Sequence, residues 1–415
     1  MSPGTGTLDV ARIQADFPIL KRQVNGKRLV YLDSASSAQK PQVVLDAMDR
    51  IYRESYANVH RGVYTIAEEA TAAFEAARTK VARFVGASES REIVFTRNAT
   101  EAINLVAYSW ARANLRAGDV IVLSHLEHHA NVVPWHILRE ERGVEIRWIP
   151  LTDDQRLDLE DLDRLLDGAS LLAVTAMSNV TGTIVDVAHL ARAARAAGAH
   201  VLVDGCQAVP QMPVDVADWG ADFVAFSAHK LLGPSGIGAL WARAELLEAM
   251  PPFMGGGEMI RDVTTEGFVP NELPWKFEAG TPAIVEAVGM GAAIDYLQAI
   301  GMEEVRAHER ALTRYALDAL GDRFGDRLTI YGPPSADDRG GVISFLFDDI
   351  HAHDVSQVVD EEGVCVRAGH HCAKPLMRQL GIPATTRASF GVYNDQADAD
   401  ALVDALAKAE SFFAV

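Results

Sequence analysis

The chain has 415 residues, and its 38 Lys and Arg against 57 Asp and Glu give a formal net charge of −19. This acidic balance lacks the basic excess that binding to a nucleic-acid backbone or an anionic membrane would use, so we expect neither partner. With 49% apolar and 23% charged residues, an odd three cysteines, and no evident signal peptide or membrane span, we expect a folded cytoplasmic protein with reduced thiols.

The pattern of the first two thirds of the chain predicts an α/β domain. A helix is expected over 65–84, because Thr65 and Glu68 match a capping box and Gly86 follows the end. Apolar runs then alternate with helical stretches such as 100–115 and 186–197, which is typical of strands buried on both faces of a mostly parallel sheet. These runs are 92–96, 119–124, 145–151, 170–177, 200–204 and 222–227.

Three features organise the rest of the chain. The run 237–242 follows a Gly-Pro-Ser-Gly turn that is too short for a parallel crossover, so we predict an antiparallel seventh strand. The segment 251–282 is rich in Gly and Pro and is predicted to be a long irregular connection. A helix is expected next, over 283–297. Beyond about residue 300 short strands and helices predict a smaller α+β domain, with elements at 327–331, 341–347, 353–362, 364–367 and 386–390. We expect a large domain over 22–300 and a small domain formed by 1–21 and 301–415.

The strongest candidate for chemistry is Lys230, which lies just past the carboxyl end of a predicted strand. A lysine at such a place can form a Schiff base with an aldehyde cofactor, and pyridoxal phosphate is the common one. That cofactor also needs an acid near its pyridine nitrogen and a cradle for its phosphate. Asp204, at another strand end, suits the first need, and Gln207 can donate to the ring oxygen.

The phosphate cradle is expected between a strand and a helix, in the run 96–101, where free backbone N–H groups would face an anion. Thr100 would add a hydroxyl, and Ser227 and His229 would add further donors. Taken alone, Asp204 is more often a turn former or helix cap, and Thr100 is a plausible ordinary N-cap. Their joint occurrence, in this order, favours the cofactor.

A series of short motifs runs along the chain: Tyr31-Leu32-Asp33-Ser34-Ala35, Asn58-Val59-His60-Arg61-Gly62, Arg97–Ala107, Glu127-His128-His129-Ala130-Asn131, Ser178-Asn179-Val180-Thr181-Gly182, Asp204–Gln207, Ser227–Pro234, Phe277-Glu278-Ala279-Gly280-Thr281-Pro282 and Arg367-Ala368-Gly369-His370-His371-Cys372. With these motifs the chain resembles, over nearly its whole length, the group II (Suf-type) cysteine desulfurases of the class V aminotransferase superfamily. The resemblance implies the fold type I of pyridoxal-phosphate transferases, with a mostly parallel seven-stranded sheet in the large domain.

The same resemblance implies a role for each site residue. Lys230 would be the Schiff-base lysine and proton shuttle, and His128 would stack over the ring. Asp204 would contact the pyridine nitrogen and Gln207 the ring oxygen. The phosphate would be held by Ala99, Thr100, Ser227 and His229, and by Thr281 from the other subunit of a homodimer. The substrate carboxylate would be bound by Asn179, Arg387 and Arg367.

Cys372 is the residue that would distinguish a desulfurase from an aminotransferase. Its neighbours Arg367, His370 and His371 can lower the pKa of its thiol and favour the nucleophilic thiolate. Neighbouring residues of an extended segment point to opposite sides, so we expect no metal site here. Of the remaining cysteines and histidines, Cys206 and Cys365 are expected to be small buried hydrophobes, and His351 and His353 to open a helix, with a role near a sulfur acceptor left open.

The implied reaction converts L-cysteine to L-alanine and leaves a persulfide on Cys372, whose sulfur would pass to a Suf-type acceptor protein and an iron–sulfur scaffold. One alternative is a selenocysteine lyase acting on L-selenocysteine, since a single atom separates the two substrates. Another is a catalytically silent scaffold subunit, against which Lys230 and Cys372 argue. A dinucleotide-binding dehydrogenase is disfavoured, because no GxGxxG motif follows an early predicted strand.

Overall fold

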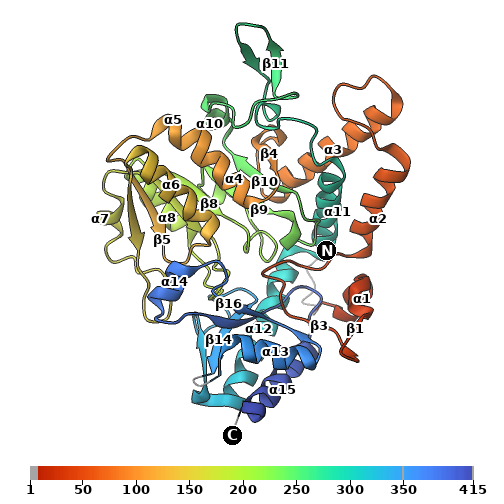
Figure 1. Ribbon diagram of the computed structural model, residues 1–415, viewed down its shortest axis with the longest axis vertical. Helices are drawn as coiled ribbons and strands as arrows, with labels where there is room; N and C mark the ends of the chain where they lie inside the picture. Colours follow the sequence, from red (N-terminus) through yellow and green to blue (C-terminus); the bar gives the residue numbers. More distant parts are fainter. Residues whose placement is uncertain (1–7, 348–349, 414–415) are drawn as a thin grey trace, which may run out of the picture.

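The computed structural model describes residues 8–347 and 350–413, and its larger lobe is built on a seven-stranded sheet (Figure 1). Strand β10 is antiparallel to its two neighbours and the other strands are parallel, as predicted. The α/β fold class is thereby confirmed. The strands are, in sheet order, β4 (Ile93–Thr96), β10 (Gly238–Ala242), β9 (Phe223–Ser227), β8 (His200–Asp204), β7 (Ala169–Thr175), β5 (Val120–Ser124) and β6 (Glu145–Ile149).

Both faces of this sheet are buried under helices, which explains the continuous apolar runs. On β5, Val122 packs into one hydrophobic core and its neighbours Ile121 and Leu123 pack into the other, because side chains alternate along a strand. Residues 99–114 form one helical stretch with a central π turn at Val106–Ala111. The helices of the larger lobe are α2 (Gln42–Arg50), α3 (Thr65–Phe84), α4 (Ala99–Leu105), α5 (Arg112–Asn114), α6 (Val133–Arg142), α7 (Leu162–Leu166), α8 (Val187–Ala196), α9 (Val216–Trp219), α10 (Ala244–Ala249) and α11 (Ile284–Ile300).

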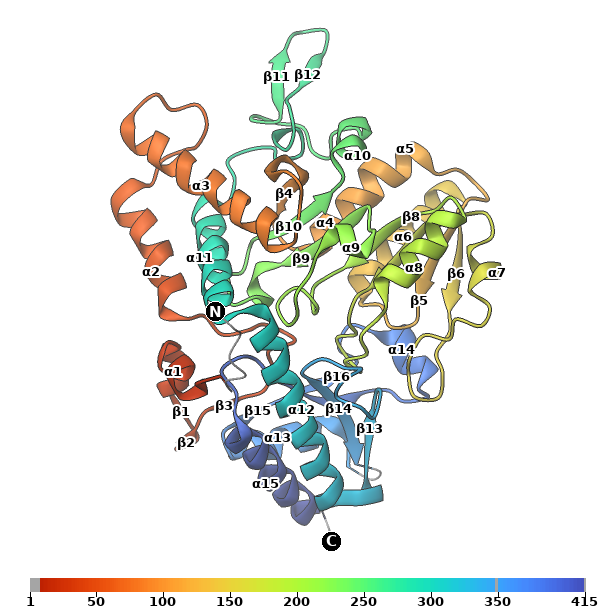
Figure 2. The same cartoon turned by 180° about the vertical axis from the view of Figure 1, so that it is seen from behind.

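Helix α3 has the predicted bounds, but the predicted capping box at its start is wrong. A capping box needs Thr65 in a non-helical conformation, whereas Thr65 is already the first helical residue. The N-cap is Tyr64, whose carbonyl accepts from Ala67 and Glu68 and whose side chain caps nothing. Helix α3 then packs against α11, with α2 on the other side of α11 (Figure 2).

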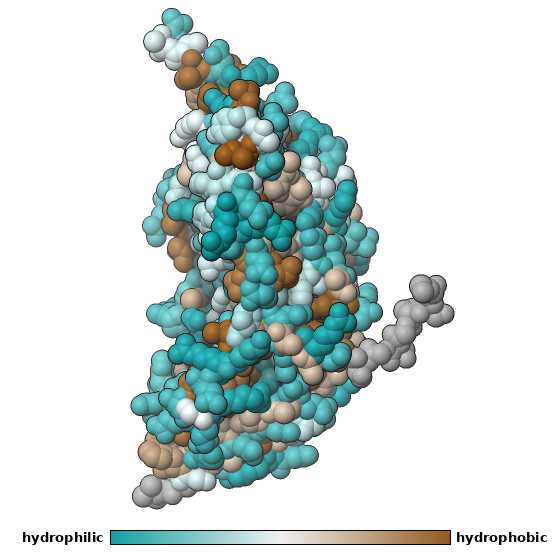
Figure 3. Space-filling view, turned by 90° about the vertical axis from the view of Figure 1, so that its right-hand side faces the viewer, coloured by the Kyte–Doolittle hydropathy of each residue, from teal (hydrophilic) through white to brown (hydrophobic). Residues whose placement is uncertain are grey.

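The segment 251–282 is not wholly irregular, so this prediction is wrong for part of it. Strands β11 (Ile260–Val263) and β12 (Phe268–Pro270) form a hairpin that projects from the end of the lobe (Figures 1 and 2). Its turn is closed by the Thr264 hydroxyl, which accepts from the backbone of Glu266 and Gly267. The hairpin buries no face in this chain, so no alternating pattern marked it in the sequence. Apolar side chains accordingly stand out at this end of the surface (Figure 3).

The smaller lobe contains the predicted second group of strands, in an antiparallel sheet of order β13-β14-β17-β16. The predicted strand 364–367 is divided: β15 (Val364–Cys365) pairs in parallel with β3 (Val30–Tyr31), and only the next residues join the main sheet. The sheet strands are β13 (Leu328–Tyr331), β14 (Val342–Phe347), β16 (Arg367–Gly369) and β17 (Thr385–Ser389). Its helices are α12 (Met302–Phe324), α13 (Ala352–Glu361), α14 (Lys374–Gln379) and α15 (Gln396–Phe413).

The N-terminal residues contact both lobes. This part begins with α1 (Val10–Ala15), a 3-10 turn and the short hairpin β1 (Gln23–Val24) and β2 (Lys27–Arg28). Phe17 packs into a core of the larger lobe, whereas Leu32 packs into the core of the smaller one. The domain division at 22–300 stays a prediction, and residues 1–7, 348–349 and 414–415 of the expected small domain lie outside the described residues.

Within residues 8–347 and 350–413, no single helix is long and apolar enough to cross a bilayer. Helices α11 and α12 meet the length and composition test only as a pair, and they are bent by 75° with respect to each other.

Candidate active site

One cavity of about 230 Å³ lies where the strand ends of the large sheet face the smaller lobe. It is lined by all but one of the predicted site residues, namely Ala99, Thr100, His128, Asn179, Asp204, Gln207, Ser227, His229, Lys230, Arg367, Cys372 and Arg387. The exception is Thr281, which lines a neighbouring cavity of about 320 Å³. The tertiary structure therefore brings together residues that are spread over nearly 290 positions of the chain.

The acidic end of the cavity is formed by Asp204, the last residue of β8, which is only 4% exposed. Its Oδ1 accepts from the backbone N–H of Cys206 at 3.0 Å. Cys206 was predicted to be fully buried, but it is only partly buried. It packs against the hydrophobic core and also lines the cavity. Cys365 is also only half-buried, on β15.

The opposite end of the cavity has the features of a phosphate cradle. Asn98, and not Thr100, is the N-cap of α4, since its Oδ1 accepts from the backbone N–H of Glu101 at 2.9 Å. Thr100 is thus free of the capping role. The loop lies against β10 at Gly238, where an added Cβ would be 2.7 Å from the Cα of Asn98. Glycine is required there because the backbone of the cradle approaches so closely.

Lys230 lies in a 3-10 turn, Ala228–Lys230, directly after β9. The carbonyl of His229 anchors this turn by accepting from the backbone N–H of Ala38 at 2.9 Å and from Lys40 Nζ at 3.3 Å. Lys40 was missed by the sequence analysis, and burial lowers its pKa to about 8. Burial and the Lys230 charge also lower the pKa of His229 to about 4, so its imidazole is neutral at physiological pH.

His128 lines the cavity as a neutral ring. Burial, followed by the nearby Lys230 charge, lowers its pKa to about 4. Its Nδ1 accepts from the backbone N–H of Ala130 at 3.1 Å, which places the ring proton on Nε2. The preceding Glu127, missed as a functional group, is buried and accepts from the backbone of Thr175 at 2.9 Å and from Asn131 Nδ2 at 2.7 Å. These bonds hold the loop that carries His128.

Arg387, on β17, provides a buried cationic group at the third side of the cavity. Its Nη1 donates to the carbonyl of Asn179 at 2.8 Å, and its Nη2 donates to Asp33 Oδ1 at 3.0 Å and to Ser36 Oγ at 2.6 Å. Its Nε is buried and has no hydrogen-bond partner among the described residues. An unpaired buried N–H of a guanidinium is costly, which suits a site for a carboxylate. Arg367 Nη1 also donates to Ser36 Oγ, at 2.8 Å.

The Cys372 loop is held in a conformation that side chains rarely adopt, with φ of +49° at His371 and +55° at Cys372. The backbone N–H of His129 donates to the carbonyl of Cys372 at 2.7 Å, and His129 Nε2 accepts from the backbone N–H of Lys374 at 3.0 Å. Asn179 Nδ2 donates to the carbonyl of His371 at 2.8 Å. The larger lobe therefore holds this loop in place. Asn179 binds the loop through its side chain and the predicted carboxylate site, at Arg387, through its carbonyl.

The expected electrostatic role of His371 is wrong. Its ring is buried, and its Nε2 forms hydrogen bonds with the carbonyl and the hydroxyl of Thr385. Burial, together with the Arg387 charge, lowers the pKa of His371 to about 2. A neutral imidazole supplies no positive charge to the thiol of Cys372. The nearby permanent cations are the two arginines of the cavity wall, Arg367 and Arg387.

The donor set of the cavity fits pyridoxal phosphate. Its lining combines a lysine, a buried carboxylate and the start of a helix, whose loop approaches the backbone of Gly238 closely. Across the ranges 8–347 and 350–413, no group of three or more His, Cys, Asp or Glu side chains is arranged to hold a metal ion.

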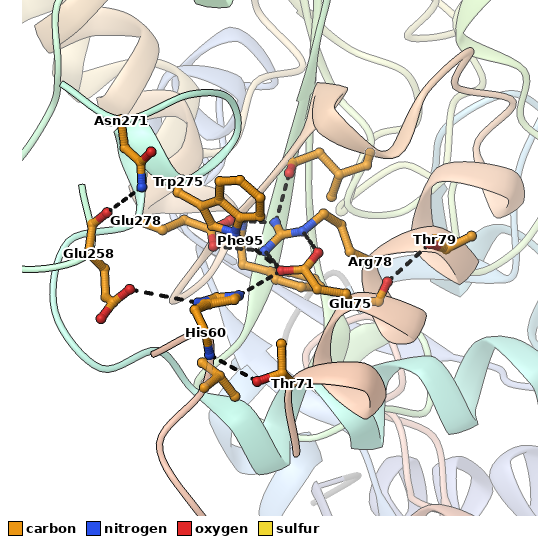
Figure 4. Close-up of polar contacts among 12 residues, drawn as sticks. His60, Thr71, Glu75, Arg78, Thr79, Phe95, Glu258, Asn271, Trp275 and Glu278 are labelled. Atoms are coloured by element: carbon orange, nitrogen blue, oxygen red, sulfur yellow. Dashed lines mark hydrogen bonds and ion pairs between the residues drawn. The ribbon is translucent and has the colours of Figure 1, made fainter. Parts of the chain in front are cut away.

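A buried charged cluster fixes the loop that carries Thr281 (Figure 4). Arg78 of α3 donates through Nη1 and Nη2 to the two carboxylate oxygens of Glu278, at 2.6 and 2.9 Å. Glu278 also accepts from the backbone N–H of Phe95 on β4 at 2.7 Å. His60 extends the cluster through Glu75. Apart from Glu278 and His60, which lie in recognised motifs, the sequence held no signal for this cluster, because its partners are far apart along the chain.

This chain is similar to a known protein family and to known enzymes. The Aminotransferase class-V family model matches residues 30–402. A probable cysteine desulfurase of Streptomyces coelicolor is 51% identical over 414 residues, covering 98% of this chain and 99% of that protein. A cysteine desulfurase of Haloferax volcanii is 48% identical, covering 98% of each.

Two solved structures have the same architecture. The crystal structure of the cysteine desulfurase CsdA from Escherichia coli matches with a TM-score of 0.90 and 40% identity, covering 98% of this chain and 100% of that one. The apo structure of a cysteine desulfurase from Thermococcus onnurineus matches with a TM-score of 0.92 and 36% identity, covering 98% and 99%.

Proposed function

Since the chain belongs to the class-V aminotransferase family and is a pyridoxal-phosphate-dependent cysteine desulfurase, we propose that it carries sulfur as a persulfide on Cys372 and supplies it to iron–sulfur cluster assembly. The observation that supports Cys372 in this role is its place on the same cavity wall as Lys230 and Arg387. The cavity is thus lined by a residue with a thiol, one with an amine and one whose guanidinium Nε has no partner among the described residues.

The residues of the cavity have distinct roles in this proposal. When bound, pyridoxal phosphate supplies an electron sink for negative charge at the Cα of an amino acid. Lys230 Nζ binds the cofactor and moves the proton at Cα. Asp204 holds a proton on the ring nitrogen, and Arg387 orients the substrate carboxylate through its free Nε. His128, a neutral ring that lines the same cavity, is assigned to stacking on the cofactor.

The sulfur step then belongs to Cys372. Its thiolate attacks the sulfur of L-cysteine, so that a bond forms between the two sulfur atoms while the Cβ–S bond of the substrate breaks. The electron pair of the broken bond stays on the carbon side, where protonation yields L-alanine. The balance is one L-cysteine and one thiol in, one L-alanine and one persulfide out.

A Suf-type acceptor protein is the proposed destination of the persulfide sulfur, for delivery to an iron–sulfur scaffold. Cys372 is only partly buried, so the loop offers its sulfur to an incoming thiol. His351 is the N-cap of α13 and His353 lies in its first turn, with their rings stacked at 5.4 Å. Their helix-opening place agrees with the prediction, and a role toward the acceptor stays an open option.

A homodimer is the proposed quaternary state. Thr281 is expected to reach a cofactor phosphate, but it does not line the cofactor cavity of the same chain. This favours contact with a phosphate bound in a second copy of the chain. Large apolar side chains are exposed beside Thr281, at Met254, and on the projecting hairpin, at Val263 and Phe268. Apolar patches are visible at this end of the surface (Figure 3). Thr281→Ala should weaken cofactor binding if the subunits pair in this way. A monomer by light scattering at micromolar concentration would contradict it.

Alanine release from L-cysteine, with a thiol reductant, tests the proposed function. Wild-type protein should release alanine, whereas Lys230→Ala and Cys372→Ala should not. Cys372→Ala should retain the visible absorbance of bound cofactor and Lys230→Ala should lose it, which separates the two roles. Full activity of Cys372→Ala would refute the persulfide assignment. Release from L-selenocysteine but not from L-cysteine would instead favour the lyase.

A further inference from the structure

Two buried glutamines connect the cofactor cavity to the smaller lobe. Gln207, on the cavity wall, donates through Nε2 to the carbonyl of Ala35 at 2.8 Å. Gln211, four residues further on and outside the cavity lining, donates through Nε2 to Gln207 Oε1 at 3.3 Å. Gln211 Oε1 in turn accepts from the backbone N–H of Gly341 at 3.1 Å. Both glutamines are at least 94% buried, with exposures of 2% and 6%.

Ala35 and Gly341, the residues at the two ends of this chain of hydrogen bonds, both bind to the end of β17. The backbone N–H of Ala35 donates to Ser389 Oγ at 2.9 Å. The carbonyl of Gly341 accepts from the backbone N–H of Phe390 at 2.8 Å. Ser389 and Phe390 are consecutive, so the hydrogen bonds form a closed circuit. The same strand carries Arg387.

The direction of each hydrogen bond in the circuit is determined. A backbone N–H can only donate, so Gly341 requires an oxygen from Gln211, and a backbone carbonyl can only accept, so Ala35 requires an N–H from Gln207. Gln211 therefore turns its Nε2 toward Gln207 Oε1, so that the Ala35 carbonyl and Gln211 both require the same orientation of the Gln207 amide. Gln207 lines the cavity, and among the described residues its Nε2 donates only to Ala35, so its second N–H can serve a bound molecule.

We propose that Gln211 is a positioning residue, which holds the Gln207 amide with its N–H toward the cofactor ring oxygen and links that contact to β17 and Arg387. This inference rests on the proposed function, because it needs pyridoxal phosphate in the cavity. Without Gln211, the Oε1 of Gln207 loses its donor and only the contact with the Ala35 carbonyl still orients the amide, so the N–H toward the ring oxygen is held less firmly. The cofactor contact and the substrate-carboxylate contact thus share one supporting circuit.

Close packing on the far side of Gln211 supports this role. A Cβ at residue 340 would lie 2.7 Å from Gln211 Oε1 and would also overlap Met177 Sδ. Gly340 therefore lets the backbone of the smaller lobe reach the glutamine. A methyl group at this position would press on Gln211 Oε1 and on Met177, which also lines the cavity, with no change to either amide.

The test is a pH titration of the visible absorbance of the cofactor-loaded protein. An N–H that donates to the ring oxygen stabilises negative charge on that oxygen, which disfavours protonation of the neighbouring Schiff-base nitrogen. Losing that N–H should therefore raise the titration midpoint, by about half to one pH unit for one hydrogen bond, and weaken cofactor affinity about 2- to 10-fold. Gln211→Leu removes donor and acceptor, and Gln211→Glu keeps size and acceptor but loses the donor.

Two further variants separate positioning from general loosening of the lobe contact. Gly340→Ala should shift the midpoint in the same direction, since it displaces Gln211. Ser344→Ala is the matched control, because it removes another buried bond between β14 and the larger lobe, from Ser344 Oγ to the Val180 carbonyl at 2.6 Å, without touching the glutamines. Its midpoint should match that of the wild type.

An unshifted midpoint in Gln211→Leu and Gly340→Ala would overturn the inference, as would an equal shift in Ser344→Ala. If Gln211→Leu does not fold, Gln211→Glu and Gly340→Ala decide the matter. Failure of the proposed function is seen separately, since wild-type protein would then titrate normally in its visible absorbance but release no alanine from L-cysteine.

Discussion

The buried pair Arg78 and Glu278 predicts a large and specific loss of stability on substitution. Their side chains are 1% and 6% exposed, and Arg78 donates to both carboxylate oxygens. In Arg78→Met, Glu278 would keep a buried charge with only the backbone N–H of Phe95 as partner. Removing one member of a buried, hydrogen-bonded pair typically costs about 3–5 kcal/mol, so we expect a free energy of unfolding lower by that amount.

Equilibrium urea unfolding at fixed excess of cofactor measures this loss. The matched control is Arg53→Met, which breaks an ion pair with Asp49 whose side chains are 73% and 57% exposed. An exposed pair on one helical stretch contributes below about 1 kcal/mol. The double variant Arg78→Met/Glu278→Leu should recover a large part of the loss, because no unpaired charge stays buried.

Two outcomes would refute the reasoning. If Arg78→Met costs no more than Arg53→Met, the pair is not an important support of the Thr281 loop. If the double variant is as unstable as Arg78→Met, the loss comes from packing rather than from the uncompensated carboxylate of Glu278.

Three other predictions concern the site and one buried acid. Arg387→Ala should raise the apparent KM for L-cysteine by about 10- to 100-fold, the cost of one to two charged hydrogen bonds, in initial rates of alanine release; an unchanged KM would contradict the carboxylate contact. Gly238→Ala should weaken cofactor affinity about 5-fold or more by overpacking against Asn98, as followed by titrating the apoprotein, and wild-type affinity would argue against the cradle. Burial raises the pKa of Glu309 well above its usual range, and its Oε2 has no hydrogen-bond partner in the described part of the chain, so the neutral form is favoured in the folded state. The free energy of unfolding is therefore unaffected by this group below its unfolded pKa and falls as pH rises above it. The increase in the free energy of unfolding caused by Glu309→Gln should grow with pH, with a slope approaching about 1.4 kcal/mol per pH unit. An equal increase at pH 5 and pH 8 would exclude this explanation.

Much of the larger lobe could be predicted because its strands are buried on both faces. Runs such as 200–204 are continuous and bounded by polar residues, and β8 has those same bounds. The short link before β10 allowed only an antiparallel return, which the structure confirms. The hairpin β11–β12 could not be found in this way, because its side chains are exposed and carry no alternating pattern.

The site residues were named from motifs, but their partners were not. Asp33 and Arg387 are 354 positions apart, and His129 and Lys374 are 245 apart. Gln211 and Gly341, which orient the Gln207 amide, are 130 apart. No local pattern encodes such pairs, because they form only when the two lobes pack on each other.

By itself, then, the amino-acid sequence determined the sheet, the order of its strands along the chain and the chemical groups placed at strand ends, since local periodicity and chain connectivity govern these features. Only the tertiary structure decided the environment of each group. Burial makes His371 neutral and so removes it as an activator of Cys372, and packing leaves Arg387 Nε without a partner among the residues that the structure describes. Protonation and unpaired hydrogen-bond capacity depend on desolvation, which is a property of the folded surroundings and not of the residue type.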